Sequence, residues 1–281
     1  MLGQIQLRRR NFPDAVDLLR AALAKLRRAR AGRDPVRVEA LITLGTCLVH
    51  MERTQEAIRR YEEASASTAA ARNPALRGQA LWGLGWAYRK LGDRPQAREL
   101  LLEAKACMER AEELPDLMRI LHNLGQVLLE EGRPADALRH FHHALRVMDR
   151  LGKPDRAAIL TEIARAHLAE GRLEDALAFG ERALQSARNV HDPLEQAEAQ
   201  LLLARLYALT GRVRKAVALL KEALPAFRDR GMEARAAGVG RELGLLLQSR
   251  GAHAPAAALL ALVAEARDRT AAPGGDAARR S

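Results

Sequence analysis

The chain has 281 residues, of which 48% are hydrophobic and only 3% aromatic, and its formal net charge is +11. No apolar run approaches the roughly 18 residues that a bilayer-spanning helix needs, which excludes an integral membrane protein and predicts a cytoplasmic one. The low aromatic content predicts a core of Leu and Ala, as closely packed helices require. Cys47 and Cys107 are far apart in the sequence, and we expect both to be reduced and buried.

A pattern of small residues recurs seven times along the chain, about every forty residues. In each copy a small residue is followed by alanine twelve positions later, and a second small residue, or Val263 in the last copy, follows after seven more. Such a period is typical of a solenoid, in which each repeat buries its apolar face by stacking on its neighbours. The first two members of the copies are Gly3 and Ala15, Gly45 and Ala57, Gly85 and Ala97, Gly125 and Ala137, Ala164 and Ala176, Ala204 and Ala216, and Gly244 and Ala256.

Each repeat predicts two antiparallel helices, about fourteen in all, and no stretch alternates with the period of two that a strand requires. We therefore expect an all-α solenoid over residues 1–269. Residues 270–281 are rich in Ala, Gly, Pro and Arg and are expected to be disordered. The repeats run over about residues 1–33, 34–72, 73–113, 114–152, 153–191, 192–230 and 231–269.

Glycines mark the expected end of the first helix in most repeats. They follow the first small residue by seven positions, where the chain must enter a left-handed turn. Glu52 takes this place in the second repeat, so we expect a weaker turn there. The glycines are Gly92, Gly132, Gly171, Gly211 and Gly251.

Prolines mark the expected start of the next repeat. Proline belongs in the first turn of a helix, best behind an Asp or Asn cap. The pairs at these boundaries are Asp34-Pro35, Asn73-Pro74, Leu114-Pro115, Lys153-Pro154 and Asp192-Pro193.

Segment 81–88 of the third repeat reads Leu-Trp-Gly-Leu-Gly-Trp-Ala-Tyr and is followed by Gly92, Ala97, Leu101 and Ala104. In their order and spacing these residues resemble the tetratricopeptide repeat family. The resemblance implies a right-handed α-solenoid of about seven helix-turn-helix repeats. The period departs from the family's commonest value of about 34 residues and resembles that of the sensor halves of bacterial transcription regulators.

The first repeat is shorter than the others, because Met1 precedes the first small residue by only two positions. Two interpretations remain open. The opening helix is a frayed cap, or the chain is the carboxy-terminal part of a longer polypeptide.

The resemblance also implies a concave groove lined by the first helix of each repeat. When the first small residue is counted as position eight, the groove-facing positions are two, five, six, nine, twelve and thirteen. An Asn at position six, here Asn123, resembles those that clamp the backbone of an extended peptide. Tryptophan is the residue most often found at binding hot spots. The groove residues that this mapping selects as peptide-binding are Trp82, Trp86, Arg89, Lys90, Arg119, His122, Asn123, Gln126, Arg165 and Arg205.

The arginines in this set predict a ligand that is acidic or carries a free carboxylate. The alternative interpretation is that Trp82 and Trp86 pack against the neighbouring repeat and that the arginines are solvated. Direct nucleic-acid binding is not expected, because the basic residues interleave with Asp and Glu and lack aromatic neighbours for base stacking.

The sequence shows no enzyme motif, so we expect no catalytic residue, no metal site and no cofactor. His140 and His143 have the spacing of a metal-binding pair on a helix. However, Phe141 occupies the family's core position between them, and we interpret the histidines as structural or solvated.

The last helix, around residues 256–264, is apolar on nearly every face. A helix of this kind usually packs on a second partner, which raises the alternative of a homodimer through the last repeat.

Together these features predict a non-enzymatic scaffold that binds a protein or peptide segment in its groove. One alternative is the ligand-sensing part of a bacterial transcription regulator. The second alternative is a structural assembly scaffold that uses its convex face or its ends.

Overall fold

The computed structural model describes residues 12–28, 35–228, 233–249, 251, 253–254 and 256–257. Every regular element within these ranges is a helix, which confirms the all-α prediction and agrees with a solenoid of about seven repeats. The predicted opening helix, the 270–281 tail and most of the expected dimer helix lie outside the described residues.

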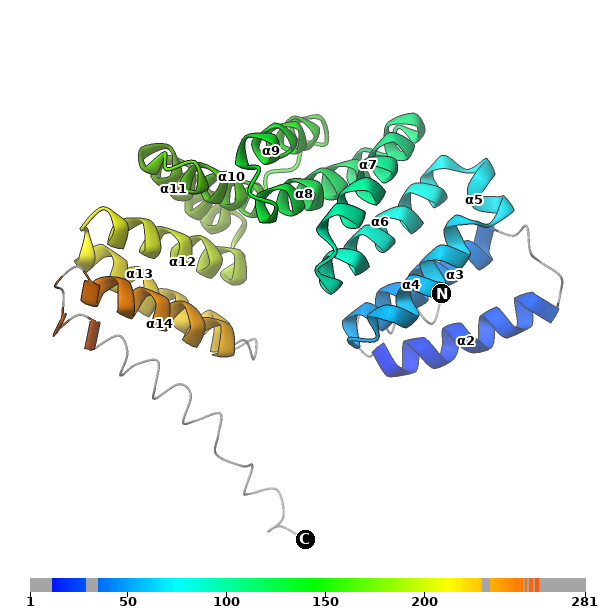
Figure 1. Cartoon of the computed structure of the whole chain (residues 1–281), viewed down its shortest axis with the longest axis horizontal. Coiled ribbons are helices and arrows are strands. Elements are labelled where there is room, and N and C mark those ends of the chain that lie inside the picture. Colours follow the sequence, from blue (N-terminus) through cyan, green and yellow to red (C-terminus); the bar gives the residue numbers. More distant parts are fainter. Residues whose placement is uncertain are drawn as a thin grey trace, which may run out of the picture. The chain divides into compact units, whose positions relative to one another are not determined.

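The chain divides into two compact units, Met1–Gly152 and Lys153–Ser281. In each unit consecutive helices run antiparallel and stack side by side (Figure 1). The described helices of the first unit are α2 (Phe12–Arg28), α3 (Pro35–His50), α4 (Thr54–Ser65), α5 (Thr68–Arg72), α6 (Pro74–Leu91), α7 (Arg94–Ala111), α8 (Leu114–Glu130) and α9 (Pro134–Arg150). Those of the second unit are α10 (Ala157–Ala169), α11 (Leu173–Val190), α12 (Pro193–Leu209), α13 (Val213–Arg228) and α14 (Glu233–Ser249).

The expected helix caps are present at α6 and α12. The Asn73 side chain accepts hydrogen bonds from the backbone N–H groups of Ala75 and Leu76, at 3.0 and 3.2 Å. Asp192 accepts equivalent bonds at the start of α12. Both residues precede a proline in the first turn, so the sequence signal for these two helix starts is confirmed.

The five predicted turn glycines are all left-handed, with φ between +74° at Gly132 and +86° at Gly92. Glu52, which replaces glycine in the second repeat, takes the same conformation with φ of 61°. Because a side chain is strained there, the turn position is imposed by the packing of the two helices rather than by the residue.

Two helix boundaries differ from the prediction. The first is Pro154, which was expected in the first turn of a helix, whereas α10 begins only at Ala157. The backbone N–H of Arg156 instead donates to the Ser186 hydroxyl at 3.0 Å, and this contact across the repeat holds the preceding residues out of the helix.

The second difference is in the second repeat, where the second helix is split into α4 and α5. Ser67 caps α5, and its hydroxyl accepts a hydrogen bond from the Ala70 backbone N–H at 3.1 Å. A serine that bonds locally competes with continuation of the helix, so α4 has only 12 residues.

The core of the first unit rests on the row of small residues. A Cβ added to Gly85 would lie 2.8 Å from Leu101 Cγ, and one added to Gly125 would lie 2.4 Å from Phe141 Cε1. The alanines of the pattern, such as Ala97 and Ala137, are fully buried where the paired helices meet.

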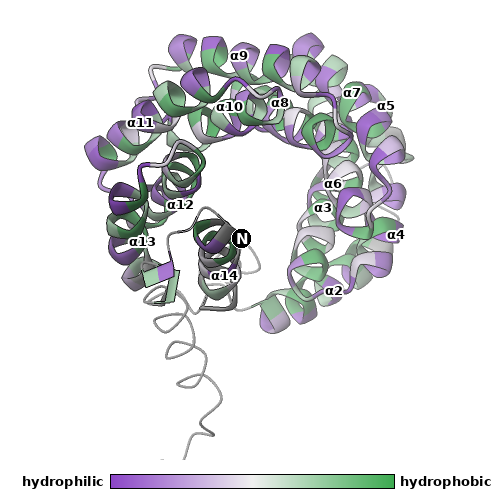
Figure 2. Cartoon of the chain, turned by 60° about the vertical axis from the view of Figure 1, so that its left-hand side comes forward, coloured by the Kyte–Doolittle hydropathy of each residue, from purple (hydrophilic) through white to green (hydrophobic). Residues whose placement is uncertain are grey.

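Helices such as α9 and α11 carry hydrophobic and hydrophilic residues in alternating strips, as amphipathic solenoid helices do (Figure 2).

Candidate functional site

The first unit contains a cavity of about 450 Å³ between α3, α4, α6 and α8. Its size is within the range of small-ligand pockets, and it places an apolar wall opposite polar side chains. Four of the predicted site residues line it, namely Trp82, Trp86, Arg119 and Asn123. The other lining residues are Ile42, Thr46, His50, Tyr61, Gln79, Gly83 and Asp116.

The two tryptophans are one helical turn apart on α6 and are both partly buried. The Arg119 guanidinium lies over the Trp82 ring, 5.0 Å from the ring centroid, in a cation–π contact. The indole nitrogen of Trp82 is buried and has no hydrogen-bond acceptor among the described residues. A buried N–H without an acceptor is unfavourable, so the indole N–H of Trp82 is an unsatisfied donor beside the pocket.

Trp86 belongs to a short column of rings. The His50 ring lies 5.3 Å from Trp86 on one side and stacks on Phe12 at 4.7 Å on the other. His50, Ile42 and Thr46 were not predicted as pocket residues, although all three lie on the face of α3 toward the pocket. Counted in the repeat frame, they occupy positions thirteen, five and nine of the second repeat, so the frame already contained their signal.

Asp116 is the buried acid of the pocket, with a relative exposure of 6%. One carboxylate oxygen accepts a hydrogen bond from the Gln79 amide at 2.8 Å, and the other pairs with Arg119. This pairing holds the Arg119 guanidinium over Trp82, while 52% of the Arg119 side chain stays exposed. Asp116 was not predicted, because it precedes the first groove position of its repeat.

Asn123 lies on α8 and is partly buried in the pocket wall. Its side-chain amide makes no hydrogen bond with any residue that the structure describes. Its amide therefore offers both a donor and an acceptor to a ligand.

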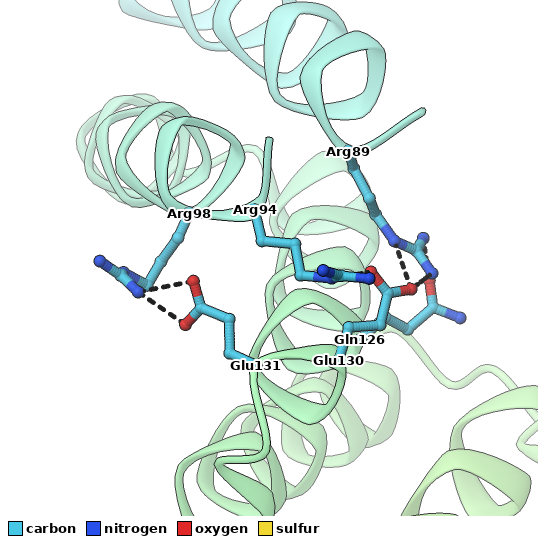
Figure 3. Close-up of polar contacts among 6 residues, drawn as sticks. All are labelled: Arg89, Arg94, Arg98, Gln126, Glu130 and Glu131. Carbon is cyan, nitrogen blue, oxygen red and sulfur yellow. Dashed lines mark hydrogen bonds and ion pairs between the residues drawn. The ribbon is translucent and has the colours of Figure 1, made fainter. Parts of the chain in front are cut away.

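Other predicted site residues have structural contacts away from the pocket lining. Arg89 on α6 bonds the Glu130 carboxylate at 2.6 Å and the Gln126 amide oxygen at 2.7 Å, both on α8 (Figure 3). A parallel link joins Arg98 on α7 to Glu131 at 2.6 Å. These bonds tie the third repeat to the fourth, so Arg89 and Gln126 serve the contact between repeats.

Two further predicted residues also lie outside the pocket lining. The His122 ring faces Phe141 of the same repeat, 6.1 Å between ring centroids. Lys90 is exposed near the end of α6.

Arg165 and Arg205 lie in the second unit, and two carboxylates accompany Arg165. Arg165 bonds Glu162 at 3.2 Å and lies 3.8 Å from Glu198. Arg205 is exposed on α12. The expected basic lining is therefore balanced by acids at Arg165.

Glu195, in the first turn of α12, has an unusual environment. Its burial, together with the charges of Asp155, Asp192, Glu198 and Glu162, raises its pKa to about 7. A carboxyl of this kind is partly protonated at neutral pH. Glu195 therefore lies in a cluster of acidic residues, where burial and the neighbouring negative charges disfavour its ionised form.

Within the described residues, no cluster of three or more His, Cys, Asp or Glu side chains could hold a metal ion. His140 and His143 both have lowered pKa values, first because of burial and then because of nearby cations. The helices that the structure describes include none that is long and apolar enough to cross a membrane. Burial raises the pKa of the Cys47 thiol to about 11, and both cysteines are free and buried as expected.

Comparison with known families identifies the repeat. The family model described as a MalT-like TPR region matches residues 68–271, and a model described as tetratricopeptide repeat matches residues 1–70. No curated protein sequence matches the chain.

Several solved structures have a similar fold. The apo form of RapI has a TM-score of 0.77 at 15% identity, covering 96% of each chain. A Rap conjugation gene regulator of plasmid pLS20, solved with the Phr* peptide, has a TM-score of 0.67 at 17% identity over 95% of this chain and 72% of its own. BtubC from P. vanneervenii has a TM-score of 0.67 at 20% identity, over 78% and 92% of the two chains. At these identities the likeness shows the fold alone.

Proposed function

Because the chain belongs to the tetratricopeptide repeat family, with a MalT-like region over residues 68–271, we propose that it is a non-enzymatic cytoplasmic protein that binds a peptide or protein segment. The binding site is the pocket of about 450 Å³ between α3, α4, α6 and α8. One similar structure, the Rap regulator of plasmid pLS20, was solved with a peptide, so this fold can accommodate such a ligand.

The unpaired polar groups of the pocket carry the proposal. Asn123 has no partner within the described residues, and the Trp82 indole nitrogen is buried without an acceptor. An extended peptide supplies what both groups lack, because each peptide unit has one N–H and one C=O. We assign Asn123 to a ligand backbone amide and Trp82 to a ligand carbonyl.

The aromatic wall of the pocket adds apolar contact area. Trp86 and His50 form a continuous surface beside Ile42, and a ligand side chain packed on it would be removed from water. Large aromatic residues of this kind supply most of the affinity at peptide-binding hot spots. We place an apolar anchor residue of the ligand here.

We also place a ligand carboxylate at Arg119. Asp116 engages one side of this guanidinium, and the exposed half of the side chain keeps N–H donors available. The ligand is thus a segment with an apolar anchor and a nearby acidic group or carboxyl terminus.

The MalT-like match favours a second candidate function, in which the chain is the sensor part of a transcription regulator. The same pocket would serve there, and its occupancy would be transmitted to a DNA-binding partner domain. This function would be established by a regulator that contains this chain and whose affinity for DNA changes when a ligand binds the pocket.

Tryptophan fluorescence provides a direct test, since the chain has only two tryptophans and both line the pocket. Peptides recovered by affinity capture would be titrated against the full chain, and a ligand of the pocket should change the emission. Trp86→Ala should weaken binding by about 2 kcal/mol or more, as is typical of a hot-spot truncation. Asn123→Ala should weaken it by about 1–2 kcal/mol, because a ligand amide loses its partner.

Lys90→Ala is the matched control, because this exposed side chain is on the same helix as the tryptophans but outside the pocket lining. Its affinity should equal that of the unmodified protein. Circular dichroism would verify that every variant is folded. Full affinity in a folded Trp86→Ala variant would mean that the partner binds elsewhere, as an assembly scaffold using its convex face or ends would bind it.

A further inference from the structure

A second, smaller cavity of about 220 Å³ lies between α2, α3 and α4. Its apolar part consists of Leu and Ala side chains, and three arginines come to it from three different helices. The lining residues are Arg20, Leu23, Ala24, Arg37, Leu41, Leu44, Arg60 and Glu63.

The charges of this lining do not balance. Among the described lining residues, Arg20, Arg37 and Arg60 supply three positive charges and Glu63 supplies one negative charge, so two positive charges are in excess. Glu63 accepts from both Arg37 and Arg60, the latter at 3.2 Å. A single carboxylate therefore serves two guanidinium groups.

The third arginine is held from outside the cavity. Arg20 on α2 pairs with Glu56 of α4 at 2.8 Å, and Glu56 also accepts from Arg53. Glu56 thus orients Arg20, but its single negative charge is shared between Arg20 and Arg53. The guanidinium group of Arg20 has further N–H groups that Glu56 does not engage.

Arg60 offers a further donor. Its Nε is buried and has no acceptor among the residues that the structure describes. Burying the N–H of a charged group without an acceptor costs free energy. The negative charge of an anion in the cavity would lower this cost electrostatically, even without a hydrogen bond to Arg60 Nε.

We propose that this cavity binds an oxyanion of the phosphate class, either free phosphate or a phosphate monoester. A dianion would neutralise the excess of two charges, and its several oxygens match the paired donors of planar guanidinium groups. Among the residues that the structure describes, the lining contains no aromatic side chain on which a base could stack, so a single phosphoryl group rather than a nucleic-acid strand fits the site.

The oxyanion site is separate from the peptide pocket. Helix α3 is the wall between the two cavities, with Arg37, Leu41 and Leu44 on one side. Ile42, Thr46 and His50 line the peptide pocket on the other side. The inference therefore stands whether or not the pocket binds a peptide.

Calorimetric titration of the full chain tests the site, with inorganic phosphate and O-phosphoserine as separate probes and chloride adjusted to constant ionic strength. Saturable binding of one equivalent is expected for at least one probe, and the tighter of the two identifies the source of the phosphoryl group. Arg37→Gln should weaken that binding by about tenfold or more, because a charge-assisted bidentate partner is lost.

Arg77→Gln is the matched control, since Arg77 pairs with Glu103 at 3.7 Å outside the cavity lining. Its phosphate affinity should remain that of the unmodified protein. An equal loss of phosphate affinity in Arg77→Gln and Arg37→Gln would show a general effect of protein charge and would overturn the proposal. Absence of saturable binding of both probes would also overturn it.

Glu63→Gln provides a test that misfolding cannot imitate. Removing the carboxylate that competes for Arg37 and Arg60 should tighten phosphate binding, by about threefold to tenfold, because the net charge of the lining rises. Unchanged or weaker binding by a folded Glu63→Gln variant would contradict the assignment of these guanidinium groups to an oxyanion.

Discussion

Gly125 illustrates how a single position sets the packing of a repeat. The ring of Phe141 fills the space that its missing side chain leaves, and Phe141 is itself fully buried. In the second repeat Tyr61 fills the corresponding space at Gly45, and its hydroxyl bonds Thr46 at 3.0 Å. A glycine on one helix and a large ring on the next thus form one unit of packing.

Gly125→Ala is therefore expected to destabilise the protein by about 1–3 kcal/mol, because the new methyl group overlaps a ring that cannot move away. The matched control is Gly238→Ala on α14, where no residue that the structure describes lies within 4 Å of an added Cβ. There alanine should stabilise the helix by about 0.5–1 kcal/mol. Thermal melting followed by circular dichroism measures both changes, and equal melting temperatures for Gly125→Ala and the unmodified protein would contradict this account.

At the scale of the element, each helix depends on what surrounds its ends. The first turn of α12 is capped by Asp192 and also holds Glu195, whose pKa is raised to about 7 by burial and by four neighbouring carboxylates. A negative charge at a helix N-terminus is normally favourable. Here desolvation and like-charge repulsion outweigh the helix dipole.

The raised pKa of Glu195 predicts a dependence of stability on pH. Between the unfolded-state pKa of about 4.3 and the folded value, the folded chain holds a proton that the unfolded chain has lost. The contribution of Glu195 is thus fully present below about pH 4 and is lost as the pH rises through about 7. Glu195→Gln should be more stable than the unmodified protein at pH 8, by on the order of 1 kcal/mol, and should lose this advantage at pH 4.

Thermal unfolding of both proteins at pH 4, 6 and 8 checks the prediction. Glu174→Gln, an exposed glutamate in the first turn of α11, is the control and should show no such pH-dependent gain. An advantage of Glu195→Gln that is the same at all three pH values would show that charge suppression is not its cause.

At the scale of the whole molecule, stability is the sum of many contacts between neighbouring helices. Within each of the two units, the described helices pack on helices that are close to them in sequence, and the longest step is from α3 to α6. Polar links such as Arg89 to Glu130 and Arg98 to Glu131 join one repeat to the next. In such a linear arrangement a repeat needs its neighbours, and distant repeats contribute little to it.

A fragment of residues 1–152, the first compact unit, should therefore fold alone and keep the peptide pocket. Its affinity for the captured peptide should agree with that of the full chain within about 0.5 kcal/mol, the spread expected when distant sites act independently. Fluorescence titration of fragment and full chain in parallel measures the difference. A folded fragment with no affinity would place essential ligand contacts in residues 153–281.

The helices, most of their ends and the repeat that stacks them can be predicted from the amino-acid sequence. Helix caps such as Asn73 and turns such as Gly92 form their hydrogen bonds with residues only three or four positions away. They can therefore be predicted from the local sequence without knowledge of the fold. The repeat frame also brought Trp82, Trp86 and Asn123 to one groove, because equivalent positions of stacked repeats face the same side.

Which polar groups are engaged in contacts and which remain available depends on how the helices pack against one another. Arg89 and Arg119 read alike in the sequence, yet Arg89 bonds the next repeat whereas Arg119 is held over Trp82 by Asp116. Likewise, the late start of α10 follows from the contact of Arg156 with Ser186, thirty residues away. Such pairings depend on distances between side chains of different helices, and no local pattern encodes those distances.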